Sequence, residues 1–469
     1  MQTITGSRAL GIINALAHFA LCVASCLLAS HVLISGPVTF RNFFYIDALS
    51  VFFILTISIV NFAAAAYSIG YIAKDAAEGT IKERKARAYY GLFNLFAFTM
   101  YFVTVVNNLG MLWVAIEMTT LVSAFLVGFY NNKKSIEAAW KYIIICSVGI
   151  TLALLGTILF YYTASRDGGV TSLNWTDMIA AAGKLDPKVL KIAFLFILVG
   201  YGTKAGIAPM HTWLPDAHSQ ALAPISALLS GVLLKTAIYA IIRFTSIINI
   251  CIGTSYSDNL FIFFGLLSLG VSAAFVIVQK DIKRLLAYSS VEHIGVITFG
   301  LGAGGALGLF GALFHVFNHA VTKSVMFFAA GNVVKKYKTS DMHVIRGVMS
   351  AMPFTGIMLM IGAFALTGSP PFSVFFSEIM ILISGFGQGL YLQSALFLAF
   401  IAVIFGAVVY HIGTIAFGKK PDDLTAAGEP LSGKIAFIFL LVFICVLGFK
   451  LPAVFSGLIN SAIEIIRGA

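Results

Sequence analysis

The sequence predicts an all-α protein that crosses a membrane many times. Of its 469 residues, 59% are hydrophobic and only 10% are charged, whereas about a quarter of the residues in a soluble globular domain are charged. The mean hydropathy is +0.96, and apolar runs of about 20 residues, long enough to span a bilayer, recur along the whole chain. These observations exclude a soluble domain with one membrane anchor.

We predict about 13 spans, with two broken helices among them. The spans cover residues 9–33, 45–73, 88–107, 109–130, 140–163, 191–217, 224–247, 258–279, 285–301, 307–332, 348–387, 391–417 and 434–457. The sixth and eleventh are too long for one straight helix. The sixth contains Pro209 and Pro215, and the eleventh contains Gly368, Pro370 and Pro371. A bilayer tolerates the backbone freed by a break only where that backbone is buried or lines a cavity.

The broken helices lie five spans apart, so they are expected to run antiparallel. This spacing favours inverted-topology repeats of five helices, which build transport sites near the membrane midplane. We therefore divide the chain into N-terminal transmembrane helices (1–87), a first bundle with its broken helix 191–217 (88–247), a second bundle with its broken helix 348–387 (258–417) and a C-terminal transmembrane helix (418–469).

The net charge of +11 is explained by membrane topology and not by nucleic-acid binding. Nineteen of the 30 lysines and arginines lie in loops on one side of the predicted membrane and eight on the other. The positive-inside rule then places the N-terminus in the cytoplasm and the C-terminus outside. We expect the chain to lie in the cell inner membrane.

Three lysines and two glutamates lie inside predicted spans: Lys204, Lys235, Lys323, Glu117 and Glu378. A charge at bilayer depth costs at least a few kcal/mol, and such groups usually face a bundle interior and mark ion or proton paths. Five of them in one chain indicate a protein that moves charge across the membrane.

Lys204 and Glu378 occupy corresponding places beside the prolines of the two broken helices. Desolvation disfavours the charged form of both groups, so each can move toward neutrality and exchange protons. A static buried ion pair, or a lysine that extends to the interface, is the alternative.

Glu117 and Lys235 have no opposite charge three or four residues away on their own helices. Each therefore needs a partner from another helix, and we predict a pair between Glu117 and either Lys204 or Lys235. Breaking such a pair would release the proton of the lysine, which makes it a switch.

His315, His319 and Lys323 recur every four residues and so share one helix face, with Asn318 close by. Histidine titrates near neutral pH and can pass protons on. Metal binding by His315 and His319 is the weaker interpretation, because the stripe has no carboxylate.

Other candidates lie beside the broken helix and in the ninth span. His211 and His218 flank Asp216; His218 either admits protons from the cytoplasm or caps a loop by bonding to Asp216. Glu292 and His293 are weaker candidates for the same path.

The cysteines predict no metal or cofactor in this chain. Most lie in apolar runs, and their spacing fits neither an iron–sulfur nor a zinc site. They are Cys22, Cys26, Cys146, Cys251 and Cys445.

Six segments carry a resemblance to a known family. They are GYGTKAGIAPMHTWLPDAHSQALAPISALLSGVLLKTAIYAIIRF, WVAIEMTTLVSAFLVGFY, EAAWKYIIICSVGI, DIKRLLAYSSVEHIG, FNHAVTKSVMFFAAGNV and GSPPFSVFFSEIMI. The chain resembles the antiporter-like, proton-conducting subunits of respiratory complex I and of multisubunit cation/proton antiporters. Within this family it is most similar to subunits F of hydrogenase-4.

The resemblance implies a role for each matching residue. Glu117 matches the glutamate paired with the broken-helix lysine, Lys204, and Lys235 matches the lysine that connects this pair to the rest of the path. His315, His319 and Lys323 match a central relay. Glu378 matches the exit residue, and His218 matches a histidine on the input path.

The resemblance also implies a non-catalytic, proton-translocating subunit of a membrane-bound redox complex of the hydrogenase-4 or formate hydrogenlyase type. Its expected partners are other membrane subunits and peripheral redox subunits that hold Fe–S clusters and a NiFe centre. The lysine-rich axis favours H⁺ over Na⁺, because cationic lysine repels Na⁺. Alternatives are a secondary cation/proton antiporter, a subunit of an ion-coupled inorganic carbon uptake complex, and a structural anchor.

Overall fold

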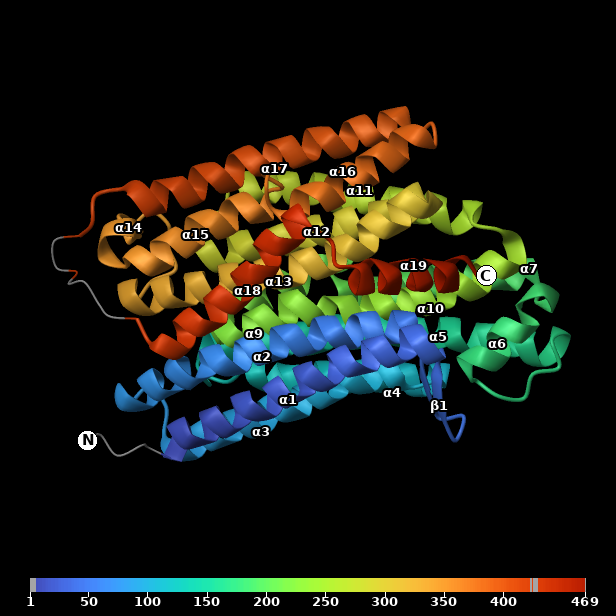
Figure 1. Ribbon diagram of the computed structural model, residues 1–469, viewed down its shortest axis with the longest axis horizontal. Helices are drawn as coiled ribbons and strands as arrows, with labels where there is room; N and C mark the ends of the chain where they lie inside the picture. The colour runs from blue at the N-terminus through green and yellow to red at the C-terminus, as the bar shows by residue number, and fades with distance from the viewer. Residues whose placement is uncertain (1–5, 422–423, 425–428, 469) are drawn as a thin grey trace.

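The computed structural model describes residues 6–421, 424 and 429–468, and shows a bundle of long helices that run roughly along one direction. The start of α1 and the short helix α14 lie at one end of the bundle (left in Figure 1). A two-stranded hairpin, helix α6 and the end of α19 lie at the other.

The first half of the chain, up to Ile252, forms the following elements: α1 (Gly6–Ser35), β1 (Val38–Phe40), β2 (Phe44–Ile46), α2 (Ala48–Ala77), α3 (Glu83–Val105), α4 (Leu109–Val127), α5 (Lys133–Asp167), α6 (Trp175–Ala181), the 3₁₀ turn η1 (Ala182–Lys184), α7 (Pro187–Ala205), the 3₁₀ turn η2 (Met210–Thr212), α8 (Trp213–Gln220), α9 (Ala223–Leu228), the π-helical segment η3 (Leu229–Leu233) and α10 (Leu234–Ile252).

The second half forms α11 (Ser255–Ile277), α12 (Ile282–Ala303), α13 (Gly305–Tyr337), α14 (Val348–Ala351), α15 (Pro353–Leu366), α16 (Ser373–Gly387), α17 (Tyr391–Phe417), α18 (Leu431–Phe449) and α19 (Ala453–Arg467). Within the described residues, 11 helices are long and apolar enough to cross a membrane, with α9, η3 and α10 counted as one. The chain is therefore a multi-pass membrane protein. The total of 13 spans, the inverted repeats, the domain limits and the orientation of the termini remain predictions.

Both predicted helix breaks are present. The first separates α7 from η2 and α8, and Gly206 caps α7 with a φ of 82°. The second separates α15 from α16, and Gly368 has a φ of 66°. Glycine suits both places because residues with a side chain rarely adopt a positive φ.

A third interruption was not predicted. The span expected at 434–457 is divided into α18 and α19, because Pro452 cannot continue the hydrogen-bond ladder of a helix and stands instead at the N-cap of α19. The segment between α5 and α7, where no span was expected, is also partly helical, since it contains α6 and η1.

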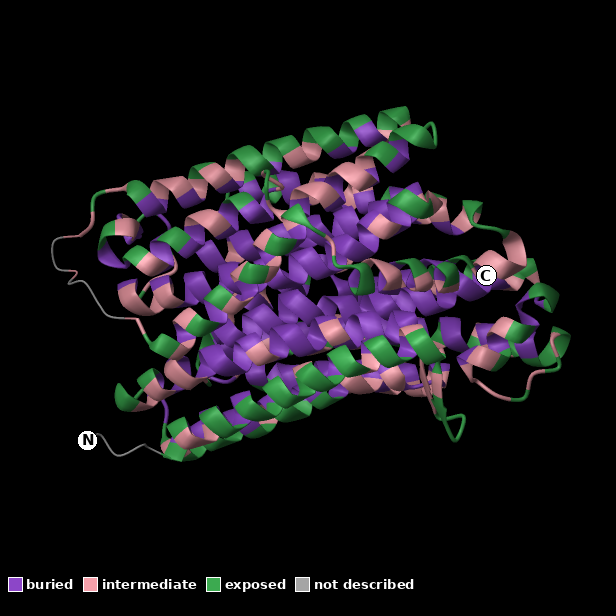
Figure 2. Cartoon of the chain, viewed as in Figure 1, coloured by how far each residue is buried: buried purple, intermediate pink, exposed green. Residues whose placement is uncertain are grey.

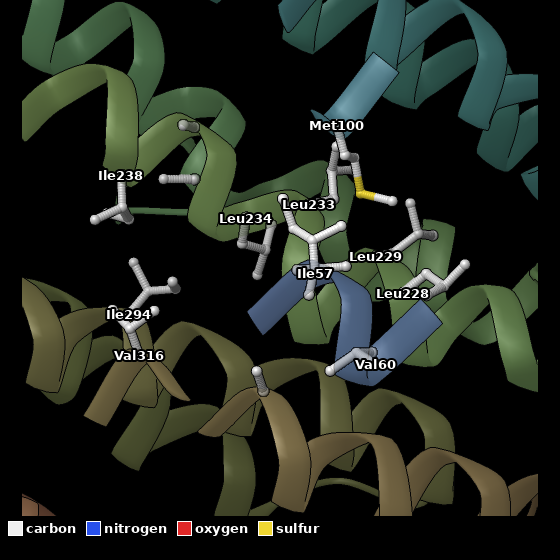
Figure 3. Packing of buried hydrophobic residues seen from close by; sticks show 14 of the residues in the cluster. Ile57, Val60, Met100, Leu228, Leu229, Leu233, Leu234, Ile238, Ile294 and Val316 are labelled. Atoms are coloured by element: carbon white, nitrogen blue, oxygen red, sulfur yellow. The ribbon is translucent and has the colours of Figure 1, made fainter. Parts of the chain in front are cut away.

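Helices α2, α10, α12 and α13 form the centre of the bundle, whereas α1 and α17 are mostly exposed. Figure 2 shows this as a buried centre with exposed outer helices. Aliphatic side chains from several helices fill the centre (Figure 3); they include Ile57, Val60, Met100, Leu228, Leu229, Leu233, Leu234, Ile238, Ile294 and Val316. Polar groups on the central helices are therefore held away from both lipid and bulk water.

A buried ion pair fixes the start of α2 to α10. Asp47 is the N-cap of α2 and accepts a 2.9 Å hydrogen bond from the Ser50 amide. Its carboxylate also accepts two bonds from Arg243, at 2.6 and 2.7 Å. Arg243 itself is buried, with 3% exposure.

Candidate functional site

Lys204 lies in the last turn of α7, directly before the break, and is fully buried. Its ammonium group donates a 2.8 Å hydrogen bond to Thr120 on α4 and a second bond to the hydroxyl of Tyr142 on α5. It also lies 4.7 Å from the centre of the Tyr142 ring. Two hydroxyls and an aromatic ring, not a carboxylate, therefore surround this lysine.

Glu117 lies one turn before Thr120 on α4 and is partly exposed. One carboxylate oxygen accepts a 2.8 Å hydrogen bond from Ser147, and the other has no partner among the described residues. The predicted direct ion pair with Lys204 or Lys235 is not formed, since Glu117 joins no salt bridge in the part of the chain that the structure describes. Glu117 is nevertheless within electrostatic range of Lys204.

Lys235 is the first of several buried titratable residues that lie next to one another in the bundle centre. It lies in the first turn of α10, just after the π-helical segment η3, and is almost fully buried. Its ammonium group contacts Nδ1 of His319 at 2.7 Å and donates a second bond to the carbonyl of Ser230. The partner of Lys235 is therefore the predicted histidine stripe and not Glu117.

The histidines are connected through His293 on α12. The ring of His293 stacks on that of His319 with 4.4 Å between centroids, and its Nδ1 lies 2.9 Å from Nε2 of His315. Nδ1 of His315 lies 3.0 Å from the hydroxyl of Ser377 on α16. His293, a weaker candidate from the sequence, thus links the two histidines of α13.

Glu378 closes this row of groups. Its carboxylate and the rings of His293 and His315 each offer an atom, and the three atoms lie within 4.8 Å of one another. All three residues are buried. Lys235, His319, His293, His315 and Glu378 therefore form one contiguous set of titratable groups contributed by four helices, and we call it the central row.

The same three residues have the composition of a metal site, and Oε1 of Glu378 has no hydrogen-bond partner among the described residues. The facing nitrogens of His293 and His315 bond to each other. His319, the other histidine of the weaker metal interpretation, bonds to Lys235 instead. The absence of a resident metal stays a prediction.

Lys323 lies one turn beyond His319 on α13 and is fully buried. Its ammonium group has no hydrogen-bond partner among the described residues, but Glu292 on α12 is within electrostatic range. Glu292 accepts a 3.1 Å bond from Ser289. These two residues form a branch beside the central row.

His218 and His211 lie near the break between α7 and α9. His218 is fully buried and stacks on Phe327 of α13 at 5.1 Å, and neither of its ring nitrogens has a partner in the described part of the chain. The alternative in which His218 caps a loop by bonding to Asp216 is wrong, since Asp216 pairs with Lys141 and Arg284. His211 packs beside Tyr288 at 6.1 Å, apart from the central row.

Sequence reasoning missed four hydroxyl residues of the site: Thr120, Tyr142, Ser147 and Ser377. Each bonds a predicted residue, as described above. A hydroxyl side chain in an apolar run carries no charge to mark it, so only its position relative to Glu117, Lys204 or Glu378 along the chain was a usable signal.

Comparisons with known proteins decide the family. Residues 106–406 match the family described as NADH:quinone oxidoreductase/Mrp antiporter, transmembrane. Residues 33–79 match the N-terminal region of complex I chain 5. The chain belongs to this antiporter-like family.

Curated relatives within the family include hydrogenase components. The chain is 39% identical over 384 residues to a hydrogenase-4 component F homolog from Methylacidiphilum infernorum, with 81% of this chain and 80% of the relative covered. It is 32% identical to hydrogenase-4 component B of Escherichia coli K12, with 82% of this chain and 57% of the relative covered. The chain thus spans little more than half the length of component B.

Two solved structures share the fold of this antiporter-like chain. One is the archaeal membrane-bound sulfane sulfur reductase, with a TM-score of 0.81, 24% identity and coverage of 98% of this chain and 97% of that chain. The other is the Mrp complex from Dietzia sp. DQ12-45-1b, with a TM-score of 0.85, 18% identity and coverage of 98% and 93%. At these identities the likeness concerns the fold.

Proposed function

We propose that this chain is a proton-translocating, antiporter-like subunit of a membrane-bound redox complex of the hydrogenase-4 type. The observation that carries the proposal is the central row, a buried and contiguous set of titratable groups from Lys235 to Glu378. The relatives of this chain that are named as hydrogenase-4 components support the assignment to a redox complex.

The central row has the chemistry of a proton relay. A neutral imidazole donates from one ring nitrogen and accepts at the other, so a proton taken up on one side allows release on the other. Lys235 offers an ammonium group to Nδ1 of His319, and His293 and His315 face each other through ring nitrogens. Glu378 is the carboxylate that receives the proton at the end of the row.

Glu117 and Lys204 are the proposed input of the coupling signal. Residue Glu117 is partly exposed on α4, so a neighbouring membrane subunit can contact it, although its unpaired carboxylate oxygen is buried; Lys204 is held inside the bundle. A change in the charge or position of Glu117 changes the electrostatic stabilisation of the Lys204 ammonium group. Helix α7, which carries Lys204, packs against α10, which carries Lys235.

The redox chemistry belongs to partner subunits in this proposal. Fe–S clusters and a NiFe centre would reside there, and this chain would be the non-catalytic part that moves protons. The assembly would lie in the cell inner membrane, with the N-terminus of this chain in the cytoplasm and its C-terminus outside. The charge distribution of the loops supports that orientation.

Replacement of Glu117 tests the proposal. We expect the complex with Glu117→Gln to assemble and transfer electrons, but to take up protons at least tenfold more slowly in vesicles that contain a pH-sensitive dye. Glu464→Gln is the matched control, because Glu464 is exposed on α19 and lies outside the site. Parental proton uptake by Glu117→Gln would favour a structural anchor.

The main alternative is a secondary cation/proton antiporter without redox partners. Its support is the fold shared with the Mrp complex. Gentle purification from native membranes separates the two functions: nickel, iron and hydrogenase-like subunits in the preparation support the redox complex, whereas antiporter subunits without metal support the alternative.

A further inference from the structure

A polar cavity of about 340 Å³ lies where α5 and α12 begin and α8 ends. Nine of its ten lining residues are polar or charged, with three cations and three carboxylates. The charged ones are Lys134, Glu137, Lys141, Asp216, Asp281 and Arg284. Opposite charges in equal number leave the cavity without a net charge that would select an anion or a metal, and its polar wall suits water.

Ion pairs hold the wall of this cavity together. Asp216 on α8 pairs with Lys141 on α5 at 3.3 Å and with Arg284 on α12 at 3.0 Å. All three side chains retain some exposure, between 24% and 49%. The cavity is thus built from three helices and open to solvent, at the end of the bundle that the charge pattern places in the cytoplasm.

Lys283 lies directly behind this wall. It precedes Arg284 on α12 but is buried, with 6% exposure. Its ammonium group donates a 2.8 Å bond to the carbonyl of Ala221 and approaches that of Ser219 at 3.5 Å, at the end of α8. In the described ranges, no carboxylate forms a salt bridge with Lys283, although Asp281 acts on it at longer range.

His218 lies beyond Lys283. The cavity is lined by Asp216, Ser219 and Gln220 of α8, whereas His218 of the same short helix is fully buried against α13. Lys283 and Lys323 are both within electrostatic range of His218. Cavity, Lys283, His218 and Lys323 therefore form a series that leads from solvent toward the central row.

We propose that this cavity is the aqueous entrance for protons and that Lys283 transfers them from cavity water to His218. The inference rests on the proposed function and adds its entry route. The neutral amine of Lys283 takes a proton from hydronium in the cavity, which leaves water. The ammonium group then gives that proton to a ring nitrogen of His218, and the imidazolium gives it to the amine of Lys323. Only N–H and O–H bonds form and break.

A structural role for Lys283 makes a different prediction from a relay role. A cation at the C-terminal end of a helix stabilises it and bonds the last carbonyls. Arginine can fill that role but does not release its proton, because its pKa is above about 12. Lys283→Arg therefore keeps the positive charge and removes only the proton transfer.

The first test measures proton uptake by the assembled complex that carries Lys283→Arg. We expect a loss of at least tenfold with electron transfer retained, while Lys280→Arg, an exposed neighbour before α12, behaves as the parent. Uptake by Lys283→Arg above half of the parental rate would overturn the relay. If the parental complex itself takes up no protons, the proposed function fails, and not the entrance alone.

The second test keeps Lys283 and examines the cavity directly. We expect the cysteine of Gln220→Cys to react with a charged, membrane-impermeant thiol reagent applied to the cytoplasmic face, above the background labelling of the native cysteines. We also expect this modification to reduce proton uptake at least tenfold. Ile144→Cys is the control, because Ile144 is 57% exposed on the apolar outer face of α5, where such a reagent has no access. A Gln220 cysteine that stays unmodified, or whose modification leaves uptake unchanged, would overturn the entrance even if Lys283→Arg failed to assemble.

Discussion

Two hydroxyl groups set the environment of Lys204, the buried lysine at the first helix break. Thr120 and Tyr142 accept its hydrogen bonds, and Glu117 acts on it only at a distance. Hydrogen bonds to a charged group contribute about 1.5–3 kcal/mol each. The hydroxyls therefore stabilise the ammonium form, from which Lys204 would release its proton in the proposed function.

Tyr142→Phe removes one of these acceptors and keeps the aromatic ring. We expect proton uptake by the complex to fall about tenfold, the equivalent of about 1.4 kcal/mol, because the Lys204 ammonium group loses a partner in a buried site. Tyr101→Phe is the matched control: Tyr101 bonds Ser58 at 3.0 Å and forms no hydrogen bond with a lysine among the described residues. Parental uptake by Tyr142→Phe would show that this hydroxyl is not required.

At the residue scale, charge was the signal that the sequence made visible. Lysines and glutamates in apolar runs were identifiable because their burial is costly, and the structure buries Lys204, Lys235 and Lys323 as expected. The position of His293 between His319 and His315 was not identifiable. It depends on how α12 packs against α13, which the spacing within either helix does not determine.

At the second helix break, the backbone of Gly368 lies close to the carboxylate of Glu378. A side-chain carbon added at Gly368 would overlap the carboxylate of Glu378, and the φ of 66° at this position also disfavours any side chain. Gly368 therefore leaves the room in which Glu378 reaches the central row.

Gly368→Ala should displace Glu378 from His293 and His315. We expect proton uptake to fall as strongly as in Glu378→Gln, because both changes remove the carboxylate from the end of the row. Gly387→Ala is the control, since Gly387 lies at the end of α16, the helix that carries Glu378, with open space around it. Different uptake rates for Gly368→Ala and Glu378→Gln in vesicles would contradict this account.

The Asp47–Arg243 pair makes a separate prediction about stability. Removing one partner leaves a buried charge uncompensated, so Asp47→Asn and Arg243→Met should each lower the free energy of unfolding by about 3–5 kcal/mol. The double variant should lose less than the sum, as measured by thermal unfolding in detergent. Glu78→Gln, which breaks the exposed Lys74–Glu78 pair, should change the free energy of unfolding by less than about 1 kcal/mol. Strict additivity of the two buried changes would contradict a direct pair.

At the element scale, proline and glycine determined what the sequence could predict. Pro209 and Pro370 marked the two predicted breaks, which the structure contains. Pro452 lay inside the span expected at 434–457 and was not read as a break, although it separates α18 from α19. Proline marks a place where a helix stops, but whether another helix follows depends on packing, here against α2, α10 and α13.

The whole molecule separates a polar interior from an apolar periphery. The titratable residues of the site lie mostly on the central helices, whereas α1, α5, α17 and α18 carry large exposed apolar side chains toward lipid or toward other subunits. This distribution follows from the cost of charge in a bilayer. Composition therefore predicted the membrane fold, but which outer helices contact partner subunits depends on surfaces outside this chain.

The most direct test of the account is the ratio of protons taken up to electrons transferred by the assembled complex with His293→Phe. The variant keeps an aromatic ring beside His319 and removes both ring nitrogens, so we expect assembly and electron transfer with a lower ratio. His343→Phe, at an exposed position in the loop after α13, should keep the parental ratio. A His293→Phe complex that assembles and keeps the parental ratio would contradict the claim that protons move through the central row.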